Sequence, residues 1–244
     1  MTTALYETLK PYLEFLHLQI TQEEFNSLEK MRFEMLSDSM YKTFSTIFEP
    51  EEYALKHVLD SLLPLVFSKE ALKGKRVVDL GTGGGFPALP LAIMLPDSKI
   101  MAVDSRKKSA DFVSKIAEKL NLNNLEVLQC RIEDFGQDFL YREQFDIVVS
   151  RALSSLSVLL EFSMPLLKKG GQAIFYKGPK LDEEVSEAVN SMKIFGITPE
   201  NMSIKRFSSE QLPYERNFFI ARRMKSVPKK YPRRPGIAAA KPLC

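Results

Sequence analysis

The sequence predicts an α/β fold in which helices cover both faces of a mostly parallel sheet, with further helices at the N-terminus. Short apolar runs alternate with amphipathic stretches between residues 77 and 195, the pattern of parallel strands joined by helical crossovers. A glycine-rich turn follows the first apolar run, and two more apolar runs follow residue 196. With 244 residues, 45% of them hydrophobic, the chain can bury a full core.

The N-terminal region predicts helices. Apolar residues recur at helical spacing between residues 5 and 16 and again between residues 55 and 62. Thr21 and Glu24 occupy the two paired positions of a capping box, which predicts the start of another helix. We therefore divide the chain into a helical extension (1–68), an α/β domain (69–225) and a basic, proline-rich tail (226–244).

The elements of the α/β domain follow from hydrophobic periodicity. Five apolar runs predict parallel strands at residues 77–80, 100–103, 125–128, 145–149 and 173–176. Amphipathic stretches predict the helices between and after them, at residues 87–95, 107–120, 153–167 and 181–195. The last two runs, 204–207 and 217–221, have no helix between them and predict an antiparallel pair that closes the sheet.

The glycine turn after the first strand predicts a site for an adenosine-containing cofactor. Glycines let backbone N–H groups approach a ligand that any Cβ would block. An acid that ends the second strand can accept hydrogen bonds from both ribose hydroxyls. We also expect Asp79 to anchor the turn by accepting backbone N–H bonds. The cofactor-binding candidates here are Gly81, Gly83, Gly85, Phe86 and Asp104.

The turn leaves two cofactors open. Counted from Gly81, the dinucleotide pattern meets Phe86 where it needs glycine, whereas counted from Gly83 it ends acceptably on Ala88. NAD would place its pyrophosphate on the following helix N-terminus, where a bulky Phe is awkward. S-adenosylmethionine has no phosphate and tolerates the Phe, so we favour it over NAD. A glycine turn without any ligand is the structural alternative.

The ends of strands three and four should reach the same cleft, because ligands of open α/β sheets bind outside the carboxyl ends of the strands. Ile132 and Glu133 follow strand three and lie where an adenine could be contacted. Arg151 ends strand four and would bring positive charge into the cleft. The closing antiparallel pair is the arrangement of class I methyltransferases, whereas dehydrogenases usually continue into a substrate domain for which this chain has no room.

Several ordered motifs together resemble the ribosomal RNA small-subunit methyltransferase G family, formerly called glucose-inhibited division protein B. They are DLGTGGGFPALPLAI, VDS, CRIED and SRALSSL after the first four strands, HVLDSL, YKG, and the terminal KKYPRRPG and KPL, over roughly residues 50–243. The resemblance implies a Rossmann-like class I fold. It also implies transfer of a methyl group from S-adenosylmethionine to N7 of a guanine in 16S ribosomal RNA.

The resemblance also assigns roles to residues. Gly81 and Phe86 would line the cofactor pocket, and Ile132 and Glu133 would contact the adenine region. Arg151, the catalytic candidate, would lie beside the cofactor and orient its carboxylate, an RNA phosphate or guanine O6. Guanine N7 carries a free lone pair, so no base is needed, and positioning can supply ~7–11 kcal/mol. A salt bridge that caps the strand end is the alternative role for Arg151.

The tail carries basic residues between prolines, which we expect to keep it out of helix and sheet. Such a segment suits the RNA backbone, whose phosphates dominate affinity, and Tyr231 could stack on a base. Its loss should then weaken RNA binding and spare cofactor binding. The alternatives are a solvated tail, or one that packs on the domain through Tyr231 and Leu243. The candidate RNA contacts are His57, Asp60, Ser61, Lys177, Arg222, Arg223, Lys229, Lys230, Arg233 and Arg234.

For His57, a structural histidine at a helix–core junction is the alternative to an RNA contact. Composition sets further bounds. Two cysteines are too few for a disulfide framework, and the two histidines lie far from them in sequence, so we expect no metal site. No apolar run approaches the ~20 residues of a membrane span, and no signal peptide is evident. We expect a cytoplasmic monomer with 16S RNA or the small ribosomal subunit as partner. A silent RNA-binding regulator, or a methyltransferase for a small molecule or protein, is the alternative.

Overall fold

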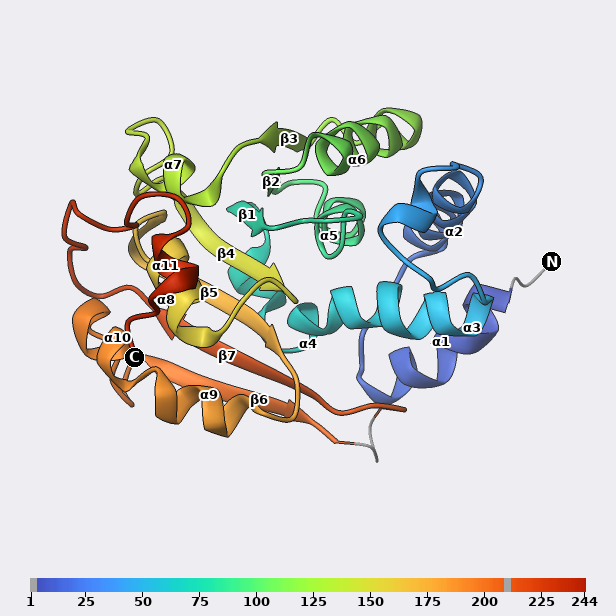
Figure 1. Ribbon diagram of the computed structural model, residues 1–244. Coiled ribbons are helices and arrows are strands. Elements are labelled where there is room, and N and C mark those ends of the chain that lie inside the picture. Colours follow the sequence, from blue (N-terminus) through green and yellow to red (C-terminus); the bar gives the residue numbers. More distant parts are fainter. Residues whose placement is uncertain (1–3, 209–211) are drawn as a thin grey trace.

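The computed structural model describes residues 4–208 and 212–244, and within them one sheet of seven strands forms the centre of the molecule (Figure 1). The strand order is β3-β2-β1-β4-β5-β7-β6. Strands β1 to β5 are parallel, and β7 is antiparallel to both of its neighbours, β5 and β6. The predicted α/β class and its antiparallel closure are confirmed. The strands are β1 (Arg76–Leu80), β2 (Lys99–Asp104), β3 (Leu125–Gln129), β4 (Phe145–Arg151), β5 (Leu167–Lys177), β6 (Met202–Phe207) and β7 (Arg216–Arg222).

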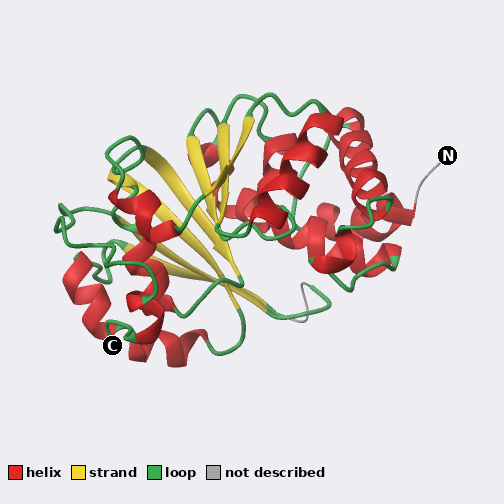
Figure 2. Cartoon of the chain, turned by 45° about the horizontal axis from the view of Figure 1, so that its top comes forward, coloured by secondary structure: helices red, strands yellow, loops and turns green. Residues whose placement is uncertain are grey.

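Helices cover both faces of the sheet (Figure 2). On one face lie α5 (Ala88–Met94) and α6 (Lys107–Leu120). On the other lie α7 (Ile132–Gln137), α8 (Leu156–Ser163), α9 (Leu181–Glu187), α10 (Val189–Phe195) and α11 (Ile237–Ala240). Successive strand residues alternate between the two cores, as Val77 and Val78 do, because side chains of a strand point to opposite faces in turn.

The N-terminal helices share a core with α5 and α6. The capping box at Thr21 and Glu24 is present and opens α2, as predicted. A π-helical turn, η2 (Ala54–Leu59), continues directly into α4 and places the HVLDSL motif beside the end of β4. The elements of this region are α1 (Ala4–Phe15), α2 (Gln22–Leu36), η1 (Tyr41–Thr43), α3 (Pro50–Tyr53), η2 and α4 (Asp60–Leu72).

The structure corrects several predicted elements. The helix predicted from residue 153 begins at Leu156, because residues 152–155 form a loop beside the carboxyl end of β4. The helix predicted at 181–195 breaks at Ala188 into α9 and α10. Two short helices, α7 and α11, were not predicted. Helix α11 contradicts the expectation for the tail, because the stretch between Pro235 and Pro242 is long enough for one helical turn.

No helix in the described ranges is both long and apolar enough to cross a membrane. Nor do three His, Cys, Asp or Glu side chains of the described residues gather as metal ligands would.

Candidate active site

Backbone conformation and close packing both require glycine in the turn after β1. Gly81, Gly83 and Gly85 have φ angles of +73°, +58° and +94°, the left-handed region that favours glycine. A Cβ on Gly81 would lie 2.6 Å from a methyl carbon of Leu153, and one on Gly85 would lie 2.4 Å from Leu89. The turn is therefore pressed against the loop that follows β4.

A cavity of about 350 Å³ lies at the carboxyl ends of the strands. It brings together four predicted cofactor residues, Gly81, Asp104, Ile132 and Glu133. The remaining lining residues are Ser105, Arg106, Arg131, Ala152, Leu153, Ser154, Phe162, Gly236 and Ala239. Gly83, Gly85 and Phe86, which were also predicted, do not line this cavity.

Asp104 lies at the cavity with its carboxylate fixed by the backbone. Oδ2 accepts the Gly83 N–H over 2.9 Å, and Oδ1 accepts the Arg106 N–H over 2.9 Å. The residue is only 5% exposed, so these bonds compensate the desolvation of a buried carboxylate. Asp104 thus holds the glycine turn in place while facing the cavity that the sequence assigned to a ribose.

Behind the turn, two polar side chains lack hydrogen-bond partners among the described residues. They are both carboxylate oxygens of Asp79 and the hydroxyl of Thr82. The sequence had suggested that Asp79 anchors the turn by accepting backbone N–H bonds, but the described part of the structure shows no such bond of standard geometry. Complete burial raises the pKa of Asp79 to about 7, and the nearby Thr82 hydroxyl, the charge of Arg151 and the Ala88 N–H offset only part of this effect. An unpartnered buried carboxylate is costly, and a cationic donor would remove that cost.

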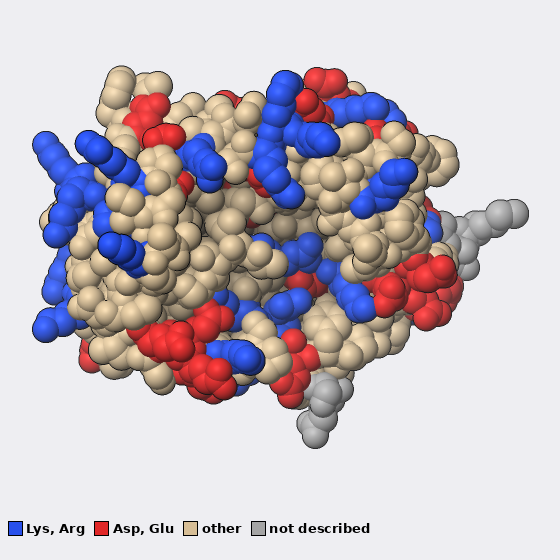
Figure 3. Space-filling model, viewed as in Figure 1, with Lys and Arg blue, Asp and Glu red and all other residues tan. Residues whose placement is uncertain are grey.

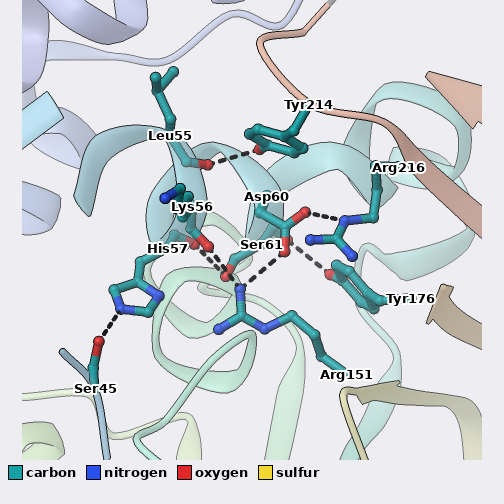
Figure 4. Close-up of polar contacts among 10 residues, drawn as sticks. All are labelled: Ser45, Leu55, Lys56, His57, Asp60, Ser61, Arg151, Tyr176, Tyr214 and Arg216. Atoms are coloured by element: carbon teal, nitrogen blue, oxygen red, sulfur yellow. Dashed lines mark hydrogen bonds and ion pairs between the residues drawn. The ribbon is translucent and has the colours of Figure 1, made fainter. Parts of the chain in front are cut away.

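A second cluster surrounds Asp60, whose side chain is completely buried (Figure 4). Arg151 donates from Nη1 to Asp60 Oδ2 over 2.9 Å, and Arg216 donates from Nε to Asp60 Oδ1 over 2.6 Å. The same Nη1 donates to the Lys56 carbonyl over 3.0 Å. Within the described residues, the Nε and Nη2 groups of Arg151 make no hydrogen bond, so donors remain for a ligand. The guanidinium carbon lies 5.4 Å from the ring centroid of Phe86.

His57 and Ser61 support this cluster from inside. The His57 ring stacks on Phe86 with centroids 4.3 Å apart, and Nε2 lies 2.9 Å from the Ser45 hydroxyl. Burial and the charge of Arg151 lower the pKa of His57 to about 3, so the ring is neutral. Ser61 donates to the His57 carbonyl over 2.6 Å. Both side chains were predicted to contact RNA, but their burial places them behind Arg151 instead.

Lys177, also predicted to contact RNA, is only 5% exposed. Its Nζ donates to Glu184 over 2.5 Å and to the Ser154 carbonyl over 2.8 Å, while Glu184 accepts the Leu156 N–H. Burial lowers the pKa of Lys177, and Glu184 opposes that shift. Lys177 therefore fixes the loop that lines the cavity, a role that sequence spacing did not reveal.

The predicted RNA contacts from Arg222 onward divide into two groups. Arg223 is buried and paired with Glu143 over 2.6 Å, and Arg233 is paired with Glu161 over 2.7 Å. The Tyr231 ring is 5% exposed and packs on Phe195, so it is not free to stack on a base. The tail thus packs on the domain, the alternative foreseen from the sequence. The side chains of Arg222, Lys229, Lys230 and Arg234 are exposed.

The surface is hollowed near the centre of the face shown in Figure 3, and Lys and Arg side chains lie around the hollow. Arg216 was not foreseen as the second partner of Asp60, nor were Gly236 and Ala239 as lining residues of the cavity. Arg216 lies at the start of a strand far from the other motifs, so local sequence carried no signal for its pairing.

Comparison with known proteins places these features in a family context. The family model for rRNA small subunit methyltransferase G matches residues 39–213. A ribosomal RNA small subunit methyltransferase G of Clostridium novyi is 38% identical over 240 residues, covering 98% of this chain and 97% of the relative. One of Desulfitobacterium hafniense is 41% identical over 199 residues, 82% of this chain and 81% of the relative.

A solved structure adds evidence on the fold. A SAM-dependent methyltransferase from Aquifex aeolicus superimposes with a TM-score of 0.52 at 22% identity, covering 75% of this chain and 96% of that one. At this identity the likeness supports the class I fold alone.

Proposed function

Because this chain belongs to the rRNA small subunit methyltransferase G family, we propose that it transfers a methyl group from S-adenosylmethionine to N7 of a guanine in 16S ribosomal RNA. The observation that carries the proposal is the adjacency of two features. One is a cavity with the lining expected for an adenosine cofactor, and the other is the Arg151 cluster at the next strand end. The cofactor and a phosphate-bearing substrate could therefore meet at one edge of the sheet.

The residues at the cavity fit S-adenosylmethionine. Asp104 lines the cavity and is placed for the ribose. Asp79 does not line the cavity, but its buried carboxylate behind the glycine turn suits the α-ammonium group. NAD fits less well. The N–H groups of Gly85 and Phe86 are bonded to the Thr82 carbonyl, and Pro87 has none, so the helix start offers few donors for a pyrophosphate. When bound, S-adenosylmethionine supplies an electrophilic methyl group on its sulfonium.

The chain's own contribution to the chemistry is positioning. Guanine N7 needs no deprotonation, and the one histidine of the cluster, His57, is neutral and enclosed. Nη1 of Arg151 is held by Asp60 and the Lys56 carbonyl, which fixes the orientation of the guanidinium group and of its remaining N–H donors. We assign Arg151 the orientation of guanine O6 or a neighbouring phosphate, since a rigid guanidinium fork matches either acceptor.

Substrate affinity would come from exposed cations. Arg222, Lys229, Lys230 and Arg234 are the candidates that remain once the paired arginines are set aside. Each can neutralise an RNA phosphate and release a counterion. We further propose that the protein acts as a monomer in the cytoplasm, on 16S RNA either free or within the small ribosomal subunit.

Methyl transfer from labelled S-adenosylmethionine tests the proposal. The full chain would be incubated separately with small-subunit RNA, large-subunit RNA and transfer RNA, and the modified nucleotide identified by mass spectrometry. We expect label in one N7-methylguanosine of the small-subunit RNA. Label on protein or small molecules would identify another methyltransferase class, and cofactor binding without any transfer would identify a silent regulator.

A further inference from the structure

The C-terminal segment reaches the cofactor cavity. Gly236 and Ala239 line the same cavity as Asp104 and Glu133. The Gly236 N–H donates to Glu133 Oε1 over 2.8 Å, although the two residues are 103 positions apart in sequence. The tail and the loop after β3 are therefore joined at the cavity itself. In Figure 1 this segment runs beside α7 and α8.

The first part of the segment is anchored through its backbone. Arg142 donates from Nη1 to the Tyr231 carbonyl over 2.7 Å and from Nη2 to the Val227 carbonyl over 3.1 Å. Gln137 donates to the Pro232 carbonyl over 2.6 Å. These donors lie in or after α7. They bind backbone carbonyls of the tail, which are present whatever the side chains of the tail are. These contacts therefore fix the position of the tail without using its charged side chains.

The second anchor is an ion pair between a partly exposed arginine and a buried glutamate. Arg233 donates from Nε and Nη2 to the two Glu161 oxygens over 2.9 and 2.7 Å, and the Glu161 side chain is 1% exposed. Without Arg233 this carboxylate would be buried and unpaired, which is costly. Ala238 is completely buried against α8. The docked position is thus built into the core of the domain.

We propose that residues 233–240 form a wall of the cofactor site, so that the tail contributes to cofactor binding directly. The inference rests on the proposed function, since it adds an element to the same site. Gly236 and Ala239 present little side chain beside Ile132 and Phe162, which leaves room for a flat, apolar-faced ring such as adenine. Ligand sites bury most of the ligand surface, and removing one wall would return part of the ring to water. Cofactor affinity should therefore depend on the tail, contrary to the expectation from sequence.

Calorimetric titration with S-adenosylhomocysteine tests the wall through a matched pair of variants. Ala239 and Ala240 are both exposed residues of α11, but of the two it is Ala239 that lines the cavity. A239Y places a ring in the cavity and should weaken binding about tenfold or more, which corresponds to ~1.4 kcal/mol. A240Y should bind like the wild type. Equal affinity in A239Y and A240Y, with normal thermal melts, would overturn the wall.

Hydrogen exchange of the unmutated chain gives an independent readout. S-adenosylhomocysteine should slow amide exchange around Gly236 and α11 at least severalfold, because a wall that contacts ligand opens less often when it is bound. Unchanged exchange at saturating ligand would also overturn the wall. The proposed function fails separately: a wild-type chain that binds the ligand but methylates no RNA refutes catalysis and leaves the wall standing.

Discussion

Asp60 and Asp79 are both completely buried carboxylates near the same edge of the sheet, and the protein treats them in opposite ways. Asp60 is held by two arginines, from β4 and β7. The Asp79 oxygens accept no hydrogen bond of standard geometry among the described residues, and burial raises the pKa of Asp79 to about 7. Asp60 thus finds its ion-pair partners within the fold, whereas we expect Asp79 to find its partner in a bound ligand. Asp60 fixes the position of Arg151. We propose that Asp79 is the group that the bound cofactor pairs with.

Removing the Asp60 carboxylate should have the largest effect. In Asp60→Ala the two guanidinium groups lose their shared partner inside the protein, and the free energy of unfolding should fall by about 3–5 kcal/mol. Urea unfolding at neutral pH measures this. Asp111→Ala, which removes an exposed i,i+4 pair with Lys107, is the control and should change stability by less than about 0.5 kcal/mol. A D60A protein as stable as the control would mean that these ion pairs do not stabilise the fold.

Neutralising Asp79 should raise the free energy of unfolding, and the size of this gain should depend on pH. Because the folded pKa of Asp79 lies above its unfolded value, the native state binds the extra proton between about pH 4 and 7. The stability from this group is present below that window and is lost as pH rises through it. Asp79→Asn should therefore gain stability over the wild type from pH 4 to 8, by at most about 4 kcal/mol.

Comparing wild type and D79N at each pH removes the contribution of His57. Its pKa is lowered to about 3, so its contribution to stability is lost as pH falls from about 6.5 toward 3 in both proteins. Unfolding curves at pH 4, 6 and 8 give the stability difference. A constant difference across this range would show that Asp79 is partnered in solution.

If Arg151 orients the substrate while Asp60 holds the arginine in place, Arg151→Ala should reduce the rate of methyl transfer more than the stability of the fold. Asp60 keeps Arg216 as a partner, so the loss of stability should be smaller than in D60A. Misplaced reactants can cost about 100-fold in rate, and we expect a loss of that order in kcat/KM for methyl transfer. Cofactor affinity should change little. A variant that is fully active, or one that melts as early as D60A, would reduce Arg151 to a structural cap.

The smallest effects should come from the exposed charges of the tail. Replacing Lys229, Lys230 and Arg234 by Gln leaves the ion pair of Arg233 intact, so cofactor binding should persist. RNA affinity should fall, and its log–log salt slope should flatten by roughly 0.7–0.9 for each lost phosphate contact. A salt titration of RNA binding checks this against Lys107→Gln, an exposed lysine on α6. Equal slopes in both proteins would remove the tail from the RNA interface.

Sequence reasoning located the cofactor edge because that edge is encoded locally. Gly81 follows β1, Asp104 ends β2 and Ile132 lies shortly after β3, and parallel strands bring their carboxyl ends together whatever the rest of the chain does. The Asp60 cluster was out of reach, since Arg216 lies 156 residues away and only tertiary packing pairs them. The prediction for Asp79 was wrong because backbone geometry, not residue type, decides which acceptors the turn can serve.

The tail shows the same limit. Charge pattern predicted cations for RNA, but it could not distinguish Arg233, which pairs with a glutamate 72 residues away, from the exposed Arg234 beside it. Whether a cation is free depends on the acid that folding brings to it, and buried acids such as Glu161 are not evident from their neighbours.

Proton release on ligand binding tests the contrast between the two carboxylates most directly. S-adenosylhomocysteine carries an α-ammonium group, which should ionise Asp79 as it binds. Calorimetry near pH 6, in buffers of different ionisation enthalpy, should then show release of close to one proton by the wild type. The release should vanish near pH 9 and be absent from D79N at both values. Binding by the wild type without proton release near pH 6 would contradict the assignment of Asp79 as the group that the cofactor pairs with.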